Sequence, residues 1–251
     1  MTKTLIVPGL DGSPDPHWQH WWALSDPHAV MVDLPAPERP KPALWEAELA
    51  GMVLRHPDSI LVGHSLGAVL VARILGLWPQ LRIRAALLVA PAEPAGAARI
   101  DAFAPLAERV LPVPTCVVAS RNDPWMGFDR AAHLARAWGS ELVDLGHAGH
   151  VNVASGFGPW AQGKRLRDDL MRASAPTADG PQRGAASGRL MAAFRSRTGI
   201  WSRVGPRCRV LAVAKSSALP ADREESGRSG RALCCAFQRP ILVPVSKGRF
   251  P

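Results

Sequence analysis

Short apolar runs alternate with helical patterns over the first two thirds of the chain. The runs that predict strands lie at residues 4–7, 59–63, 85–90 and 115–120, with weaker ones near 30–32 and 141–143. The helical patterns lie at residues 16–24, 42–55, 68–77, 129–138 and 160–171. Because a strand covered on both faces reads as a continuous apolar run, this order predicts an α/β fold with a mostly parallel central sheet of about six strands flanked by helices.

The alternation stops near residue 171, and the charge changes there as well. Residues 1–170 carry a net charge of −2, whereas residues 171–251 carry +11. Arg, Ala, Ser, Gly and Pro dominate the second part, and no helix or strand period persists there, which is typical of disordered chain. We therefore expect an α/β domain over residues 1–171 and a basic, disordered or irregular tail over residues 172–251.

The tail admits two other interpretations. Its charge would suit an arm that binds nucleic acid or an anionic membrane, but its few aromatic residues form no stacking pattern, so no specific nucleic-acid recognition is expected. Its 13 arginines against 2 lysines would also arise if a GC-rich gene were read past a frameshift. The apolar stretches at 210–214 and 241–245 are too isolated to form a core.

Several classes of protein are disfavoured by composition. No run approaches the roughly 18 to 20 apolar residues of a membrane span, and the apolar run that begins near Thr4 is too short for a secretion signal. The four cysteines, Cys116, Cys208, Cys234 and Cys235, have no paired metal spacing and are too sparse for a disulfide scaffold. We expect a cytoplasmic protein that needs no metal and no organic cofactor.

The strongest chemical signal is the pentapeptide Gly63-His64-Ser65-Leu66-Gly67, between an apolar strand and an apolar helix. A serine at such a turn needs a glycine two residues to either side, because the backbone there is strained and crowded. The turn would raise the serine oxygen above the carboxyl edge of the sheet. We therefore predict that Ser65 is a nucleophile, and that the adjacent His64 points away from it.

A serine hydroxyl is a weak nucleophile, so a base and an orienting acid must follow it in the chain. Asp123 comes directly after the run 115–120, at the carboxyl end of a predicted strand, where ligand sites of open α/β sheets gather. Asp129 and Asp144 are alternatives for the acid. Of these, Asp129 is expected to be the N-cap of the helix that it begins.

The base is expected in the loop after the last predicted strand, where two histidines stand close together. His150 is favoured because Gly149 precedes it and a turn into the last helix follows, and His147 is the alternative. The remaining histidines are expected on helix faces or at the surface: His17, His20, His28, His56 and His133.

Two further groups complete the predicted site. The backbone N–H groups of Leu66 and Leu10 are candidates for an oxyanion hole, since Leu66 follows the nucleophile and Leu10 lies in a glycine-rich loop after the first strand. Tryptophans near the same edge could wall a small acyl pocket: Trp18, Trp21, Trp22 and Trp125.

Four separated motifs, in the same order, resemble the small serine hydrolases of the RBBP9/YdeN family within the α/β-hydrolase superfamily. They are the pentapeptide 63–67 and the segments Ser120–Trp125, Gly149–Trp160 and Val7–Trp18. The resemblance covers residues 3–170. It implies a compact α/β-hydrolase fold with little or no lid and a triad of Ser65, Asp123 and His150, and it supports His150 over His147. Nothing in the family accounts for residues 172–251.

The reaction that these residues predict is two-step acyl transfer from a small or short-chain acyl ester, with thioesters and amides as further candidates. His150 would take the proton of Ser65, and Asp123 would orient the imidazole. The alternative is a catalytically silent hydrolase-fold protein that acts by binding a partner, because a fold does not dictate a function.

Overall fold

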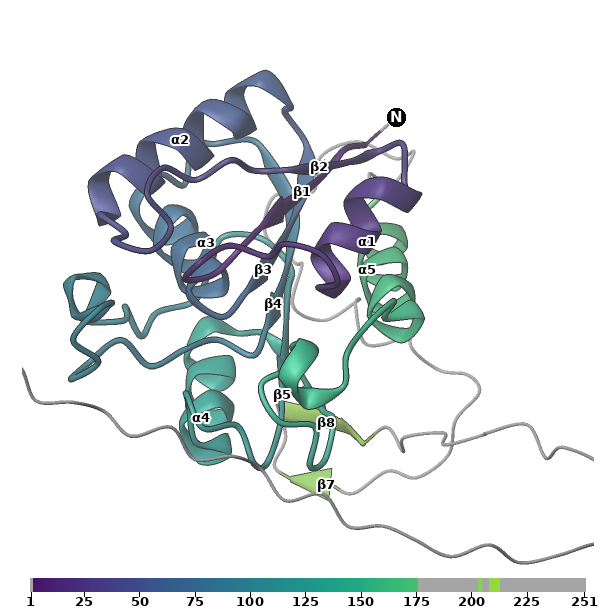
Figure 1. Cartoon of the computed structure of the whole chain (residues 1–251). Coiled ribbons are helices and arrows are strands. Elements are labelled where there is room, and N and C mark those ends of the chain that lie inside the picture. Colours follow the sequence, from purple (N-terminus) through teal and green to yellow (C-terminus); the bar gives the residue numbers. More distant parts are fainter. Residues whose placement is uncertain (1, 176–202, 205–207, 213–251) are drawn as a thin grey trace, which may run out of the picture. The chain divides into compact units, whose positions relative to one another are not determined.

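The computed structural model of the protein describes residues 2–175, 203–204 and 208–212. Its central sheet contains the six predicted strands: β1 (Thr4–Val7), β2 (Ala29–Met31), β3 (Ser59–His64), β4 (Ile83–Val89), β5 (Thr115–Ala119) and β6 (Glu141–Asp144). They are all parallel and lie in the order β2-β1-β3-β4-β5-β6 (Figure 1). The predicted parallel α/β sheet is thus confirmed.

Two further short strands come from the tail, where composition predicts none. They are β7 (Arg203–Val204) and β8 (Cys208–Ala212). β8 pairs in parallel with β6, and β7 pairs antiparallel with β8. The sequence shows no sustained strand period at these residues, because pairing with the open edge of a sheet leaves little trace in a local sequence pattern. The expectations of disorder and of a frameshift otherwise concern residues 176–202, 205–207 and 213–251, which lie outside the described residues.

Helices cover both faces of the sheet (Figure 1). One face carries α1 (Trp18–Ser25) and α5 (Ala161–Ala173). The other carries α2 (Pro42–Arg55), α3 (Leu66–Leu77) and α4 (Phe128–Trp138). All five helices correspond to predicted patterns. α3 begins two residues before its apolar pattern, because the chain enters the helix directly from Ser65.

The apolar residues of each strand divide between two core clusters, one on each face of the sheet. In β3, Leu61 belongs to the cluster that includes residues of α2, α3 and α4, whereas Ile60 and Val62 belong to the cluster that includes residues of α1 and α5. Successive strand side chains point to opposite faces. A strand that is apolar at every position therefore contributes side chains to both clusters. This explains why the strands appear in the sequence as continuous apolar runs.

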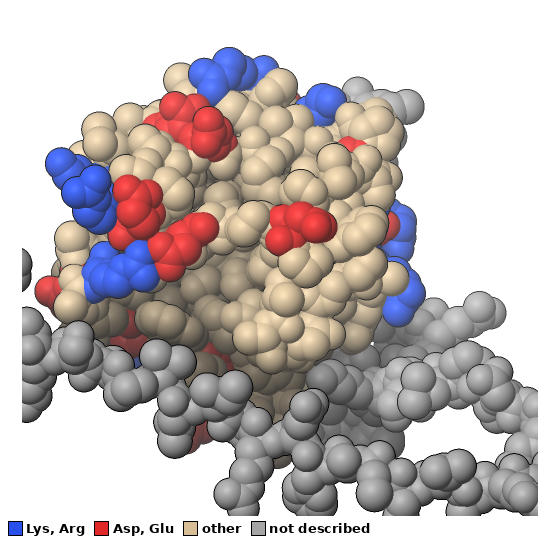
Figure 2. All heavy atoms as spheres, in the orientation of Figure 1, with Lys and Arg blue, Asp and Glu red and all other residues tan. Residues whose placement is uncertain are grey.

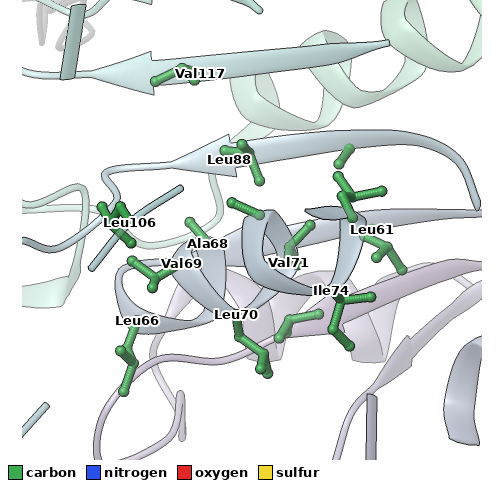
Figure 3. Close-up of a cluster of buried hydrophobic side chains, with 14 of the residues drawn as sticks. Leu61, Leu66, Ala68, Val69, Leu70, Val71, Ile74, Leu88, Leu106 and Val117 are labelled. Atoms are coloured by element: carbon green, nitrogen blue, oxygen red, sulfur yellow. The ribbon is translucent and has the colours of Figure 1, made fainter. Parts of the chain in front are cut away.

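The helix that follows Ser65 lies in the middle of the larger cluster (Figure 3). Its Leu66, Leu70 and Ile74 are fully buried, and Figure 3 shows this helix packed against strand residues that include Leu61 and Leu88. Burying each such side chain stabilises the fold by about 1.5–3 kcal/mol. The start of α3 is therefore held firmly by the core.

Because β1 to β6 are parallel, their carboxyl ends lie along one edge of the sheet. The longest connection at this edge that has no α-helix, residues 90–114, contains a single 3-10 helix, η1 (Asp101–Phe103). It packs Phe103 and Leu111 into the larger cluster. This connection is therefore part of the core packing and does not form a separate lid.

The described surface is mixed in charge. On the face that Figure 2 shows, acidic and basic side chains of the described residues are interspersed, with no continuous basic patch. Among the described helices, none has the length and apolar character needed to cross a membrane.

Candidate active site

Ser65 stands in a sharp turn between β3 and α3. Its backbone has φ +56° and ψ −122°, a conformation that residues other than glycine adopt only under constraint. A Cβ on Gly63 would lie 2.6 Å from the Cα of Ala68, and one on Gly67 would lie 2.3 Å from the carbonyl oxygen of Val7. Only glycine fits at these two positions, so the pentapeptide forms the predicted turn for the predicted steric reason.

Ser65, His150 and Asp123 meet in one hydrogen-bonded series. The Nε2 atom of His150 lies 2.8 Å from the Oγ of Ser65, and its Nδ1 lies 2.9 Å from each carboxylate oxygen of Asp123. Because a carboxylate only accepts, Nδ1 carries the proton, and Nε2 is free to accept from the serine hydroxyl. Ser65 and His150 are 8% and 5% exposed. A serine whose proton can pass to a shielded imidazole has the arrangement of an activated nucleophile.

The loop between β6 and α5 holds His150 by its backbone. Its N–H donates to the Oγ of Ser155 at 3.0 Å, and the hydroxyl of Ser155 donates to the Oδ1 of Asn152 at 2.9 Å. The N–H of Gly149 donates to the Oδ1 of Asn122 at 2.8 Å. No role for Asn122, Asn152 or Ser155 is predicted from the sequence. Their sequence signal is that they lie within the motifs Ser120–Trp125 and Gly149–Trp160, beside the two predicted triad members.

The alternative acids and base lie elsewhere. The carboxylate of Asp144 accepts from Arg121 Nε and from the N–H of Gly146, each at 2.8 Å. Asp129 lies in the first turn of α4, whose N-cap is Gly127, so its predicted capping role is wrong. The chain enters this helix one residue earlier than the apolar pattern indicates. His147 is exposed to solvent.

Two other histidines are buried beside His150. The Nε2 of His64 lies 2.9 Å from the carbonyl oxygen of His150, and the ring centroids of these two residues are 5.0 Å apart. His17 is the N-cap of α1, where its Nδ1 accepts from the N–H of Gln19, and its ring centroid lies 4.9 Å from that of His64. The sequence predicts His17 on a helix face or at the surface, but it is a buried N-cap residue, because α1 begins next to the rings of His64 and Trp18.

Burial sets the charge of these two rings. Burial lowers the pKa of His17 to about 4, with a further contribution from the charge of His150. Burial also holds the pKa of His64 well below its usual range, and the charges of His150 and His17 act in the same direction. Both rings are therefore neutral near pH 7. The other histidines, His20, His28, His56 and His133, are partly or fully exposed.

The loop that precedes Leu10 lies against the turn that carries Ser65 and Leu66. A Cβ on Gly9 would lie 2.9 Å from the Cβ of Ser65 and 3.4 Å from the backbone nitrogen of Leu66, so the loop after β1 lies against the turn. Within the described part of the chain, neither the N–H of Leu66 nor that of Leu10 has a hydrogen-bond partner. Both N–H groups are thus available to an oxygen atom of a substrate.

Two of the tryptophans that are predicted to wall an acyl pocket are buried in the core. Trp18 and Trp22 are buried with Trp160 in the smaller core cluster, and the Nε1 of Trp18 donates to the carbonyl of Val151 at 2.8 Å. A fully buried indole does not line an open pocket, so the sequence expectation fails for these two. Trp21 is on the outer side of α1 and exposed, whereas Trp125 is 43% exposed with its ring centroid 5.9 Å from that of His150.

The described residues offer no metal site. Over residues 2–175, 203–204 and 208–212, no three or more His, Cys, Asp or Glu side chains are grouped to hold a metal ion. The buried Cys116 is a free thiol, and burial raises its pKa above the usual range.

Comparison with known proteins places this geometry in a family. Residues 4–168 match the family described as serine hydrolase. The chain belongs to this serine hydrolase family. A YdeN-like hydrolase from Pectobacterium atrosepticum is 37% identical, with 70% of this chain and 94% of that chain covered and a TM-score of 0.64. The RBBP9/YdeN resemblance within the α/β-hydrolase superfamily is thereby confirmed.

More distant structures share the fold of this serine hydrolase. The ydeN gene product of B. subtilis is 20% identical, with 68% of this chain and 100% of that chain covered and a TM-score of 0.58. MGS-MChE2, an α/β hydrolase from a lagoon-sediment metagenome of Mar Chica, Morocco, is 16% identical, with 69% and 92% covered and a TM-score of 0.53. No curated protein matches the chain. The family match ends at residue 168, so the tail has no counterpart in it.

Proposed function

We propose that this serine hydrolase cleaves small or short-chain acyl esters, with Ser65 as nucleophile, His150 as general base and Asp123 as the orienting acid. The observation that carries the proposal is the unbroken series of hydrogen bonds from the Oγ of Ser65 through the imidazole of His150 to the carboxylate of Asp123. No other carboxylate of the described residues contacts His150.

The first half of the reaction forms an acyl-enzyme. His150 Nε2 accepts the proton as the Oγ of Ser65 attacks the carbonyl carbon, and Asp123 stabilises the imidazolium that results. The imidazolium then gives this proton to the alkoxide that leaves. In the second half, water attacks the acyl group, loses a proton to His150, and releases the acid from Ser65.

Charge on the carbonyl oxygen is met by the backbone N–H groups of Leu66 and Leu10. Leu66 directly follows Ser65, Leu10 follows Gly9, which lies against the turn, and neither N–H has a partner among the described residues. In hydrolases of this chemistry one such donor contributes about 3 kcal/mol to the stability of the transition state. These donors belong to the turn and to the loop after β1, so they need no movement of a lid.

A preference for small acyl groups follows from the surroundings of His150. Trp125 from the β5–α4 connection is 43% exposed beside the ring of His150, and Val153, three residues after the base in the chain, is 43% exposed as well. They offer apolar surface to an acyl or alcohol group without enclosing it. The long connection at residues 90–114 packs several of its side chains into the larger core cluster.

A fluorophosphonate probe tests the nucleophile directly. We expect one covalent adduct on the wild-type protein, mapped to Ser65 by peptide mass, and none on Ser65→Ala. The control Ser174→Ala, at the C-cap of α5, should label like the wild type. A folded wild-type protein that takes no label, or that takes it at another serine, would contradict the proposal.

Substrate size is tested with p-nitrophenyl esters of increasing acyl length. We expect kcat/KM to be highest for acetate to butyrate and to fall for octanoate. Equal or rising values for the longer esters would contradict the proposed acyl preference while leaving the nucleophile intact.

A further inference from the structure

His64 connects the turn that carries the nucleophile to the backbone of the base. It is the last residue of β3, directly before Ser65, and its ring is 5% exposed. Its Nε2 lies 2.9 Å from the carbonyl oxygen of His150. A carbonyl oxygen only accepts, so the Nε2 of His64 carries a proton and donates it to this bond.

This bond holds the backbone carbonyl of His150. The backbone groups next to it are held by other residues. The N–H of His150 is held by Ser155, and the next carbonyl, that of Val151, is held by Trp18. Among the described residues, His64 adds a second hydrogen bond between this loop and the turn, beside the one that joins His150 Nε2 to the Oγ of Ser65. His64, which holds the backbone of the base, and Ser65, which donates its hydroxyl proton to the base, are therefore adjacent in the chain.

The turn that carries His64 is held rigidly in place. Gly63 and Gly67 leave no space for a Cβ, and the start of α3 is buried in the core. The ring of His64 is also wedged between other rings, with His17 at 4.9 Å, His150 at 5.0 Å and Trp18 at 5.8 Å between centroids. Movement of the base away from Ser65 would have to break the hydrogen bond and separate these rings.

We propose that His64 is a positioning residue, which sets the distance between His150 and Ser65 by its hydrogen bond to the carbonyl of His150. This inference rests on the proposed triad. Proton transfer needs the two atoms within hydrogen-bond distance, and a displacement of about 1 Å costs about 100-fold in rate. A histidine is suited to the task because its buried neutral ring offers a directed N–H donor.

Two substitutions separate the hydrogen bond from the packing. His64→Met fills a similar volume without a donor, and His64→Gln places an amide N–H where Nε2 stands. With p-nitrophenyl acetate we expect His64→Met to lower kcat by about 10- to 100-fold with KM nearly unchanged, and His64→Gln to recover most of the loss. A folded His64→Met protein with wild-type kcat overturns the proposal, as does an equal loss in both variants.

The wild-type protein provides a second test that needs no variant to fold. With ¹⁵N-labelled histidine, long-range proton–nitrogen spectra near pH 7 should show His64 as the neutral Nε2–H tautomer. They should also show its ring proton exchanging slowly with water. The Nδ1–H tautomer would overturn the proposal, because Nε2 could then not donate to the carbonyl of His150. A charged ring would also overturn it, because the proposed donor is a neutral ring.

Ser65→Ala in the same kinetic assay separates this proposal from the proposed function. If Ser65→Ala is inactive and His64→Met is fully active, only the role of His64 is wrong. If Ser65→Ala keeps the activity of the wild type, the triad itself is wrong, and the role of His64 is overturned with it.

Discussion

The turn that carries Ser65 and the loop that carries His150 arrive at the same point of the molecule by different means. The turn is formed by five consecutive residues that can be recognised in the sequence as one motif, although the glycine at position 67 is required by a contact with Val7 of β1. The loop is held by side chains from the β1–α1, β3–α3 and β5–α4 regions, namely Trp18, His64 and Asn122. A nucleophile can thus be specified locally, whereas its base must be specified by the rest of the fold.

The largest effect is expected from the acid that orients the base. Asp123→Asn should lower kcat by about 10⁴-fold with little loss of stability, because the amide favours the wrong tautomer of His150. The matched control is Asp144→Asn, which changes the rival carboxylate that Arg121 holds. Its kcat should stay near that of the wild type. Ester hydrolysis at saturating substrate measures both, and a similar loss in the two variants would contradict the assignment of Asp123.

The next effect tests the local character of the turn. Gly67→Ala should lower the free energy of unfolding by about 3 kcal/mol, because the new Cβ would lie 2.3 Å from the carbonyl oxygen of Val7. Gly158→Ala, in the loop of the base, adds a Cβ that meets no atom within 4 Å and should be nearly neutral. Urea unfolding of both variants compares the two regions, and equal stabilities would show that the turn tolerates a side chain.

A third effect concerns the buried rings beneath the base. The pKa of His17 is about 4 in the folded protein, against an ordinary value near 6.5, so the folded state binds fewer protons than the unfolded state between these values. Stability should therefore fall as the pH falls from 6.5 to 4, by at most about 3 kcal/mol from this residue. His17→Asn keeps a capping oxygen for α1 but does not titrate, so its stability should fall less over this window. The free energy of unfolding of both proteins is measured at several pH values. An equal fall in the two proteins between pH 6.5 and 4 would contradict this assignment.

The smallest effect is expected for a long-range contact that solvent screens. Arg99 donates to both carboxylate oxygens of Asp11 and to the carbonyl of Glu38, and this pairing lowers the pKa of Asp11. Asp11 follows Leu10, the proposed oxyanion donor. Arg99→Ala should lower kcat by about threefold and leave stability nearly unchanged, because an exposed ion pair contributes little. High salt should reduce the difference between the two proteins, and a variant with unchanged kcat at low salt would show that the loop needs no such support.

The sequence predicts the parts of this molecule that depend on local pattern. The six strands, the five helices and the glycine requirement around Ser65 are all visible as runs, periods and spacing. The burial of Trp18 and His17 is not visible, because both depend on where α1 packs against the loop after β6. Two further features are not visible in the sequence. The N-cap of α4 depends on where the helix begins to within one residue, and the pairing of β8 with β6 depends on a sheet edge that is distant in the chain.

The burial of α3 has an electrostatic consequence for the proposed reaction. The twelve peptide dipoles of this helix are aligned, and they place a partial positive charge at its amino end, which is where Ser65 stands. The first turn of α3 contains no acidic side chain to neutralise that charge, and the surrounding core contains little that could screen it. The helix that contributes most to the larger core thus also presents an uncompensated positive pole to the negative charge that develops on the substrate oxygen.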